Sequence, residues 1–206
     1  MSADAHVAAF IREHLPVVPV PGVPELRLHK AGPASGVGRL GDAAPYWAYW
    51  WGGGLALARY VLDHPAQVAG RRVVDLGAGS GLVGIAAARG GAARVTASEE
   101  DPDARVAIGL NAALNDVSMA EIVGDVTGGP APHADLLLVG DVFYAPEVAA
   151  RVTAFLDRCV AAGVAVLVGD PWRSPLPVDR LTLLARYDVT ETGVTKPAGI
   201  FAYRAG

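Results

Sequence analysis

Apolar and polar residues follow two different periods along this chain. Short runs rich in valine and leucine predict strands, and segments in which apolar residues recur every three or four positions predict helices. The predicted strands are 25–29, 72–75, 94–98, 121–123, 134–140, 164–169, 187–193 and 200–203. The predicted helices are 4–15, 55–62, 80–89, 102–114, 146–162 and 178–185.

The order of these elements predicts an α/β domain over 46–206, preceded by an N-terminal helix and extension over 1–45. Short apolar strands that alternate with helices are typical of a mainly parallel sheet with helices on both faces. No helix is predicted between the last two strands, so we expect an antiparallel edge with a turn that contains Lys196 and Pro197. Residues 31–45 are rich in glycine and include two prolines, and they predict a loop.

Composition excludes several classes of protein. Of the 206 residues, 52% are hydrophobic and 18% charged, so the chain can bury a core. The net charge of -4 argues against nonspecific nucleic-acid binding. Cys159 is the one cysteine, which excludes an intrachain disulfide and a thiolate zinc cluster, and its apolar neighbours predict a core position. No metal site is predicted.

The N-terminus and the hydropathy of the chain indicate where the protein works. The first fifteen residues have the pattern of neither a signal peptide nor a transit peptide. No apolar run approaches the roughly 20 residues that a membrane span needs. We therefore expect a cytoplasmic protein with neither a membrane nor a nucleic acid as its partner.

The clearest local motif is Asp75-Leu76-Gly77-Ala78-Gly79-Ser80-Gly81, between a predicted strand and a predicted helix. Gly77 and Gly79 allow a tight turn and the close approach of a ligand. Glu99 ends the next strand, about 20 residues on, where a carboxylate can accept both hydroxyls of a ribose. Asp75 suits a ligand with a positive amino group, as in the methionine part of S-adenosyl-L-methionine. The glycine spacing differs from the G-x-G-x-x-G of dinucleotide-binding proteins, so the sequence favours the methyl donor.

Further cofactor contacts are expected around this loop. Asp125 follows the third strand and can accept a hydrogen bond from an adenine amino group, or it can form an ordinary turn. Trp47 and Trp50 lie in an aromatic segment that can either pack over the sheet or form a wall, because aromatic faces attract cations. We assign Trp47 to the cofactor and Trp50 to the wall on the substrate side. Asn111 and Asn115 share a helix face, and for them we expect a structural role.

Candidate catalytic residues follow the fourth strand, at the edge where open α/β sheets bind ligands. Asp141 can contact the cofactor, orient an ammonium group and receive its proton, while Tyr144 can form a hydrogen bond or stack. Both are assigned as catalytic. The alternative is that Asp141 caps the helix that begins at Pro146 and that the neighbouring rings pack. Phe143, and Asp170 after the fifth strand, are assigned to the substrate side.

Taken together, these motifs resemble the electron transfer flavoprotein β-subunit lysine methyltransferases, within the seven-strand protein lysine methyltransferases. The likeness covers 45–173, and the region beyond it matches only loosely. Its carriers are Pro45-Tyr46-Trp47-Ala48-Tyr49-Trp50, Gly53-Gly54, Ala56-Leu57, Arg59-Tyr60, Asp75-Leu76-Gly77, Gly79, Asp101-Pro102, Leu110-Asn111, Gly140-Asp141, Phe143-Tyr144 and Gly169-Asp170-Pro171.

The resemblance implies a Rossmann-like seven-strand methyltransferase fold, S-adenosyl-L-methionine as cofactor, and transfer of methyl groups to lysines of the flavoprotein β subunit. It also implies that Asp141 and Tyr144 handle the lysine and that Glu99 binds the ribose. We expect a monomer. Two alternatives stay open at this point: a small-molecule N-methyltransferase of the nicotinamide type, and a noncatalytic cofactor-binding module.

Overall fold

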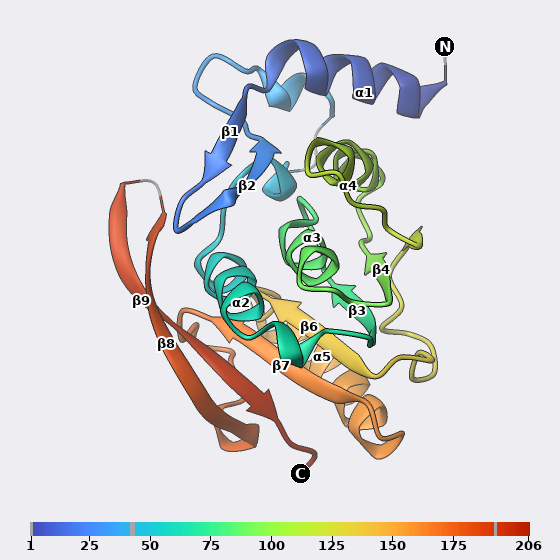
Figure 1. The fold of residues 1–206 in the computed structure, drawn as a ribbon, viewed down its shortest axis with the longest axis vertical. Helices are drawn as coiled ribbons and strands as arrows, with labels where there is room; N and C mark the ends of the chain where they lie inside the picture. Colours follow the sequence, from blue (N-terminus) through green and yellow to red (C-terminus); the bar gives the residue numbers. More distant parts are fainter. Residues whose placement is uncertain (1, 42–43, 192) are drawn as a thin grey trace.

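A seven-stranded sheet forms the centre of the protein (Figure 1). The computed structural model describes residues 2–41, 44–191 and 193–206, so positions 1, 42, 43 and 192 of the predicted extension, loop and strand lie outside the described residues. The strand order is β5-β4-β3-β6-β7-β9-β8. The strands are β3 (Arg72–Leu76), β4 (Arg94–Ser98), β5 (Glu121–Val123), β6 (Leu136–Gly140), β7 (Ala165–Asp170), β8 (Leu181–Glu191) and β9 (Val194–Tyr203).

The direction of the strands confirms the predicted fold class. Neighbouring strands from β5 to β7 pair in parallel, and β9 pairs antiparallel with both β7 and β8. This is a Rossmann-like α/β fold with a mainly parallel sheet and an antiparallel edge. Because parallel strands all end at one edge, the loops after β3, β4, β6 and β7 meet there.

Alternate side chains of the central strands enter two separate cores. In β6, Leu136 and Leu138 face one cluster, while Leu137 and Val139 face the other, as the period of two in a strand requires. Helices α2 (Gly52–Asp63), α3 (Leu82–Arg89) and α4 (Pro102–Leu114) lie on the first face, and α5 (Pro146–Ala161) covers the second (Figure 1). The prediction of helices on both faces is confirmed.

The N-terminal extension packs against the same domain. It consists of α1 (Ala3–His14) and a separate antiparallel hairpin of β1 (Val17–Val20) and β2 (Val23–His29). Phe10 and Ile11 of α1 share a hydrophobic cluster with Ala104 and Ala107 of α4. Strand β1 was not predicted, because the prolines around it favour loop. The boundary between 45 and 46 stays a prediction.

Two asparagines of α4 connect the extension to the domain. The side chain of Asn115 bonds both the N–H and the C=O of Arg27, at 2.9 and 2.7 Å. Asn111 accepts from the His29 N–H and donates to the Ser80 carbonyl, each at 2.9 Å. The structural role predicted for this pair is confirmed, and through Ser80 it extends to the glycine-rich loop.

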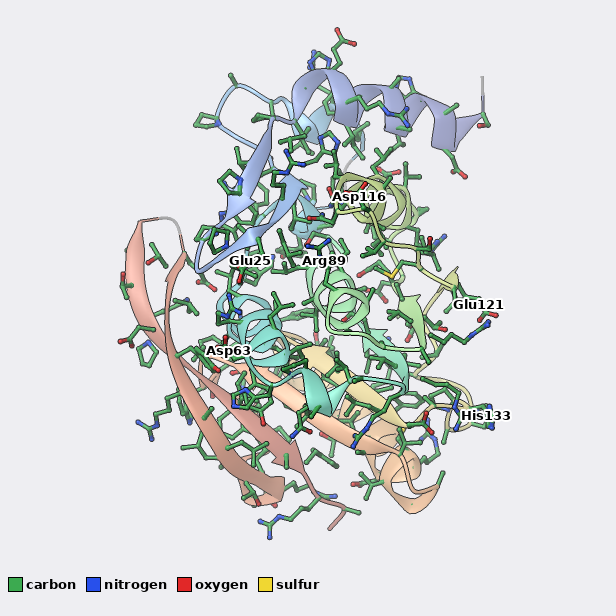
Figure 2. The ribbon with its side chains drawn as sticks, in the orientation of Figure 1. Glu25, Asp63, Arg89, Asp116, Glu121 and His133 are labelled. Atoms are coloured by element: carbon green, nitrogen blue, oxygen red, sulfur yellow. The ribbon has the colours of Figure 1, made fainter. Side chains whose placement is uncertain are left out.

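Charged pairs add links at the surface. Arg59 of α2 lies 2.8 Å from Glu25 of β2 and 2.9 Å from Asp63, and Figure 2 shows both acids on the side where β2 and α2 lie. The hydrogen bond from Arg59 lowers the pKa of Glu25. Glu121 and His133 lie on the side where the parallel strands begin, opposite the edge at which these strands end (Figure 2).

Two predictions near the C-terminus are wrong. Residues 178–185 form a short 3₁₀ helix, η4 (Val178–Arg180), and then enter strand β8. The register shifts between Leu183 and Ala185, and this bulge breaks the alternation expected of a strand. Lys196 and Pro197 lie inside β9 rather than in a turn. None of the helices in the described part of the chain is long and apolar enough to cross a bilayer.

Candidate functional site

The loop between β3 and α3 is built by glycines in left-handed conformations. Gly77, Gly79 and Gly81 have φ of 65°, 53° and 82°. At Gly77 a Cβ would lie only 2.7 Å from Cγ1 of Val142, so neither the torsion nor the space admits a side chain. The Gly77 and Ala78 N–H groups donate to the Ser98 carbonyl, at 2.9 and 3.1 Å, which joins the loop to the end of β4.

Glu99 lies directly beside this loop. Its Oε2 accepts from the Gly79 N–H at 2.8 Å, and its Oε1 accepts from the Asp101 N–H at 3.0 Å. Burial raises the pKa of the Glu99 carboxyl, and the two amide hydrogen bonds oppose that shift. Glu99 is half-buried, and Gly77 in the same loop is exposed. A tight loop with three glycines next to a carboxylate fits the adenosine part of the predicted cofactor.

Asp75 is placed behind the loop. It is 1% exposed, and its Oδ2 accepts from the Gly84 N–H at 2.7 Å. Burial raises the pKa of Asp75 to about 7. Asp75 therefore fastens the first turn of α3 to the end of β3, and its predicted contact with a ligand amino group stays a prediction.

Asp125 forms the turn that the sequence left open as an alternative. Its Oδ1 accepts from the Thr127 N–H at 2.8 Å, and its Oδ2 accepts from the Thr127 hydroxyl at 2.9 Å. Both oxygens are therefore engaged locally, as in an Asx turn. The adenine contact stays a prediction, and it would require Asp125 to share or exchange these hydrogen bonds.

The side chain of Asp141 caps a helix, but not the one expected. α5 begins after Ala145 without a side-chain cap, whereas Asp141 Oδ2 accepts from the Gly54 N–H in the first turn of α2. Its Oδ1 accepts from Nη1 of Arg173. The Asp141 side chain is 10% exposed, and burial raises its pKa while Arg173 lowers it. Each carboxylate oxygen thus has one partner, and the assignment of Asp141 as catalytic and as a cofactor contact stays a prediction.

Arg173 also binds the second acid at this edge. Its Nη1 lies 3.2 Å from Oδ2 of Asp170, and its backbone N–H donates to Asp170 Oδ1 at 2.7 Å. Asp170 is fully buried, and burial raises its pKa while Arg173 opposes the shift. We call Asp141, Asp170 and Arg173 the acid–arginine cluster. Sequence reasoning did not select Arg173, although it lies two residues after the Gly169-Asp170-Pro171 motif.

The first turn of α2 packs directly on the strand ends. A Cβ on Gly53 would lie 2.1 Å from the carbonyl oxygen of Gly169, so only glycine permits this approach. The Gly52 N–H donates to Oε1 of Glu191, whose other oxygen pairs with Lys196 of β9. Two carboxylates, one from the loop after β6 and one from β8, therefore hold the N-terminus of α2, where negative charge is favourable.

Three exposed rings gather at the same edge. Tyr46, Trp51 and Tyr144 are 62%, 38% and 55% exposed. The Tyr46 ring lies 5.7 Å from that of Trp51 and 6.3 Å from that of Tyr144, measured between centroids. The Trp51 indole N–H donates to the Tyr46 carbonyl at 2.9 Å. We call these three side chains the aromatic cluster. Tyr46 and Trp51 were not selected from the sequence, because nothing in the segment distinguishes its outward rings from its buried ones.

The other aromatic residues selected from the sequence pack inward. Trp47 is buried in the cluster beneath α1, although its Cα lies 3.9 Å from the position of a Cβ on Gly79. The half-buried Trp50 ring packs against the main core and has Lys30 Nζ 5.2 Å from its centroid. Phe143 is fully buried beside α5. The structure thus brings Trp47 near the loop by its backbone only, and it buries Phe143 and Asp170 fully. The cofactor assignment of Trp47 and the substrate-side assignments of Trp50, Phe143 and Asp170 stay predictions.

Comparison with known proteins agrees with this arrangement. A family model described as lysine methyltransferase matches residues 43–174. An electron transfer flavoprotein beta subunit lysine methyltransferase from Xenopus laevis is 39% identical over 201 residues, which cover 89% of this chain and 79% of that protein. The protein of the same name from Danio rerio is 43% identical over 132 residues, 63% of this chain and 51% of that protein. The chain thus spans about half the length of several relatives that it matches.

The fold has solved counterparts as well. The crystal structure of magnesium protoporphyrin IX methyltransferase from Synechocystis PCC 6803, solved with bound S-adenosylmethionine, superposes with a TM-score of 0.52. The match covers 75% of this chain and 80% of that chain, at 16% sequence identity. At this identity the likeness concerns the fold alone.

Proposed function

Because this chain belongs to the lysine methyltransferase family, and within it to the electron transfer flavoprotein β-subunit lysine methyltransferases, we propose that it methylates lysine side chains of that β subunit. S-adenosyl-L-methionine is the proposed cofactor. When bound, it supplies a methyl carbon that its sulfonium activates for in-line attack by an amine. The cytoplasmic location and the monomeric state stay predictions.

One observation carries the proposal: the loop that fits the cofactor and the aromatic cluster meet at the carboxyl edge of the sheet. The glycine-rich loop and Glu99 would hold the adenosine part. Val142, in the loop after β6, packs closely against Gly77 through its Cγ1. Tyr144 lies two residues further along the same loop, so its backbone is close to the glycine-rich loop. A lysine that enters between these groups would have its amine near the end of the cofactor that carries the methyl group.

The aromatic cluster suits a lysine side chain. Aromatic faces attract an ammonium group, and the apolar stem of lysine can pack against the same rings. Burial and the negative charge of Glu100 raise the pKa of Tyr144. Its hydroxyl therefore remains protonated at neutral pH, and its oxygen can accept a hydrogen bond from an amine N–H. That contact would orient the lone pair of the neutral amine for transfer.

Asp141 takes a positioning role in this proposal. Its two oxygens bind Gly54 and Arg173, and these contacts support a role in which it fixes the start of α2. The aromatic cluster is open to solvent, and the amine would lose its proton to water there. The family resemblance implied that Asp141 handles the lysine directly, and the geometry instead supports an indirect contribution.

The direct test is transfer of labelled methyl groups from S-adenosylmethionine to the purified electron transfer flavoprotein of the same organism, with a whole-cell extract beside it. Label on the β subunit that disappears when its lysines are replaced by arginine would support both the chemistry and the substrate. Label on another protein would support protein methyltransferase activity and reject the flavoprotein β subunit as the substrate. Label on a metabolite such as nicotinamide, with no labelled protein, would favour a small-molecule enzyme.

A further inference from the structure

We propose that Arg173 is a positioning residue for methyl transfer: it holds the Asp141 carboxylate against the first turn of α2 and so fixes the aromatic cluster beside the cofactor loop. This inference deepens the proposed function and rests on it. Arg173 follows β7, and its guanidinium bridges the loops after β6 and β7 through Asp141 and Asp170.

The backbone at both ends of this bridge is held in an unusual conformation. Among the described residues, the non-glycine residues with positive φ are Asp116, Asp141 and Trp172. Asp141 binds Arg173, and Trp172 directly precedes it, each with a φ of 60°. Left-handed backbone at a ring-bearing residue costs free energy and persists only where surrounding contacts impose it. Aspartate adopts this conformation comparatively readily, so the strain lies at Trp172, directly beside Arg173.

A continuous path of contacts leads from Arg173 to the aromatic cluster. Arg173 holds Asp141, and Asp141 accepts from the Gly54 N–H in the first turn of α2. Trp51 is the N-cap residue of that helix, and its indole donates to the Tyr46 carbonyl. Tyr144 lies three residues after Asp141 in the same loop. A shift of Asp141 would therefore move rings on both sides of the aromatic cluster.

The charge balance of the bridge makes this role testable. Asp141, whose side chain is 10% exposed, and the fully buried Asp170 share one cation, Arg173. Two other acids on elements packed against α2 are also paired: Glu191 with Lys196, and Glu25 of β2 with Arg59 of α2 itself. Without Arg173, Asp141 would be a buried carboxylate with no positive partner, and such a group takes up a proton at a higher pH. A protonated Asp141 would hold the Gly54 N–H more weakly.

The test compares Arg173→Met with Arg173→Lys. As a control, Arg180→Met removes an arginine that pairs with Asp157 on α5 and that makes no contact in the acid–arginine cluster. Kinetics with the flavoprotein substrate should show a fall in kcat of about 10- to 100-fold in Arg173→Met, the size expected for slight misplacement of reacting groups. The KM for S-adenosylmethionine and the Kd for S-adenosylhomocysteine should change little. Lysine should restore part of kcat, and the control should retain it.

A second measurement follows the aromatic cluster without turnover. The chain has four tryptophans, so fluorotryptophan labelling gives a resonance for Trp51, which Trp51→Phe assigns. In Arg173→Met this resonance should shift with pH at values above the ordinary titration range of an aspartic acid, because the Asp141 carboxyl is largely buried and has lost its cation. The wild type should show no such shift. Asp141→Asn/Arg173→Met should not show it either, because Asp141 is the carboxylate that accepts the hydrogen bond from Gly54 of α2.

The outcomes separate this inference from the proposed function. If the wild type labels no protein, the proposed function fails, while the Trp51 resonance still reports on the clamp. A resonance in Arg173→Met that is as insensitive to pH as that of the wild type would overturn the inference. So would a kcat equal to that of Arg180→Met with an active wild type. If the double variant still shows the pH-dependent shift, a group other than Asp141 causes it, and the inference is overturned.

Discussion

Replacing Gly77 with alanine would test whether the loop after β3 is as tightly constrained as its geometry indicates. Gly77 has a φ of 65°, and left-handed backbone costs an alanine roughly 1–2 kcal/mol. The new Cβ would lie 2.7 Å from Cγ1 of Val142, which is buried, and overpacking of this kind costs roughly 1–3 kcal/mol. The sum is about 2–5 kcal/mol, a large part of the roughly 5–15 kcal/mol that stabilises a typical protein.

Gly79→Ala is the matched control within the same loop. Gly79 has a φ of 53°, but the nearest atom to its Cβ position is the Cα of Trp47 at 3.9 Å. Only the torsional cost of about 1–2 kcal/mol applies there. Gly77→Ala/Val142→Ala should recover the steric part of the loss and leave the torsional part.

Urea denaturation, followed by circular dichroism, gives the free energy of unfolding for each variant. Calorimetry with S-adenosylhomocysteine shows whether the displaced loop still binds. We expect Gly77→Ala to lose more stability and more affinity than Gly79→Ala. Equal losses in the two variants, or no recovery in the double variant, would refute the steric argument and leave the torsion as the whole cause.

Three further predictions concern single carboxyl and phenol groups. Glu99→Ala should weaken S-adenosylhomocysteine binding by about 1–3 kcal/mol, because a charged acceptor is lost; unchanged affinity in calorimetry would reject the ribose assignment. Tyr144→Phe should lower kcat on the protein substrate by about 10-fold or more with cofactor affinity unchanged, as expected for loss of a group that orients the amine. The pKa of Asp75 is raised from the ordinary 3.8 to about 7, which means that the folded state binds the proton more tightly, so stability falls as the pH rises from about 4 to about 7. Asp75→Asn should flatten that slope in urea denaturation at several pH values, and an unchanged slope would assign it to other groups.

The central strands could be predicted because their physical cause is local. A strand buried on both faces must be apolar along its whole length, and β6 shows this from Leu136 to Val139. Strand β8 has no such constraint, because it lies at the edge and Leu183 and Leu184 are both exposed. Its apolar spacing imitates a helix, and its pairing with β9 decides the structure instead. A single sequence contains no direct record of that pairing.

The same distinction explains which parts of the candidate site could be found. Gly77 and Glu99 belong to motifs in which the spacing itself reports the geometry, so their positions at one loop edge could be predicted. The outward rings of Tyr46 and Trp51 depend on how the segment packs under α1 and against α2, and composition does not record this. Sequence analysis identified the right segment but selected Trp47, which is buried, and Trp50, which is half-buried.

Asp141 shows why a motif can place a residue correctly and still leave its role open. Its partners, Gly54 and Arg173, lie 87 residues before it and 32 residues after it, so no local pattern connects the three. Loss of activity in Asp141→Ala would follow equally from a lost proton acceptor and from a released α2. The charge on Arg173 separates these roles, because a proton acceptor becomes more basic when its cation is lost, whereas a positioning group loses its hold on α2. The pH response of α2 in variants of Arg173 therefore decides a question about Asp141 that substitution of Asp141 alone does not.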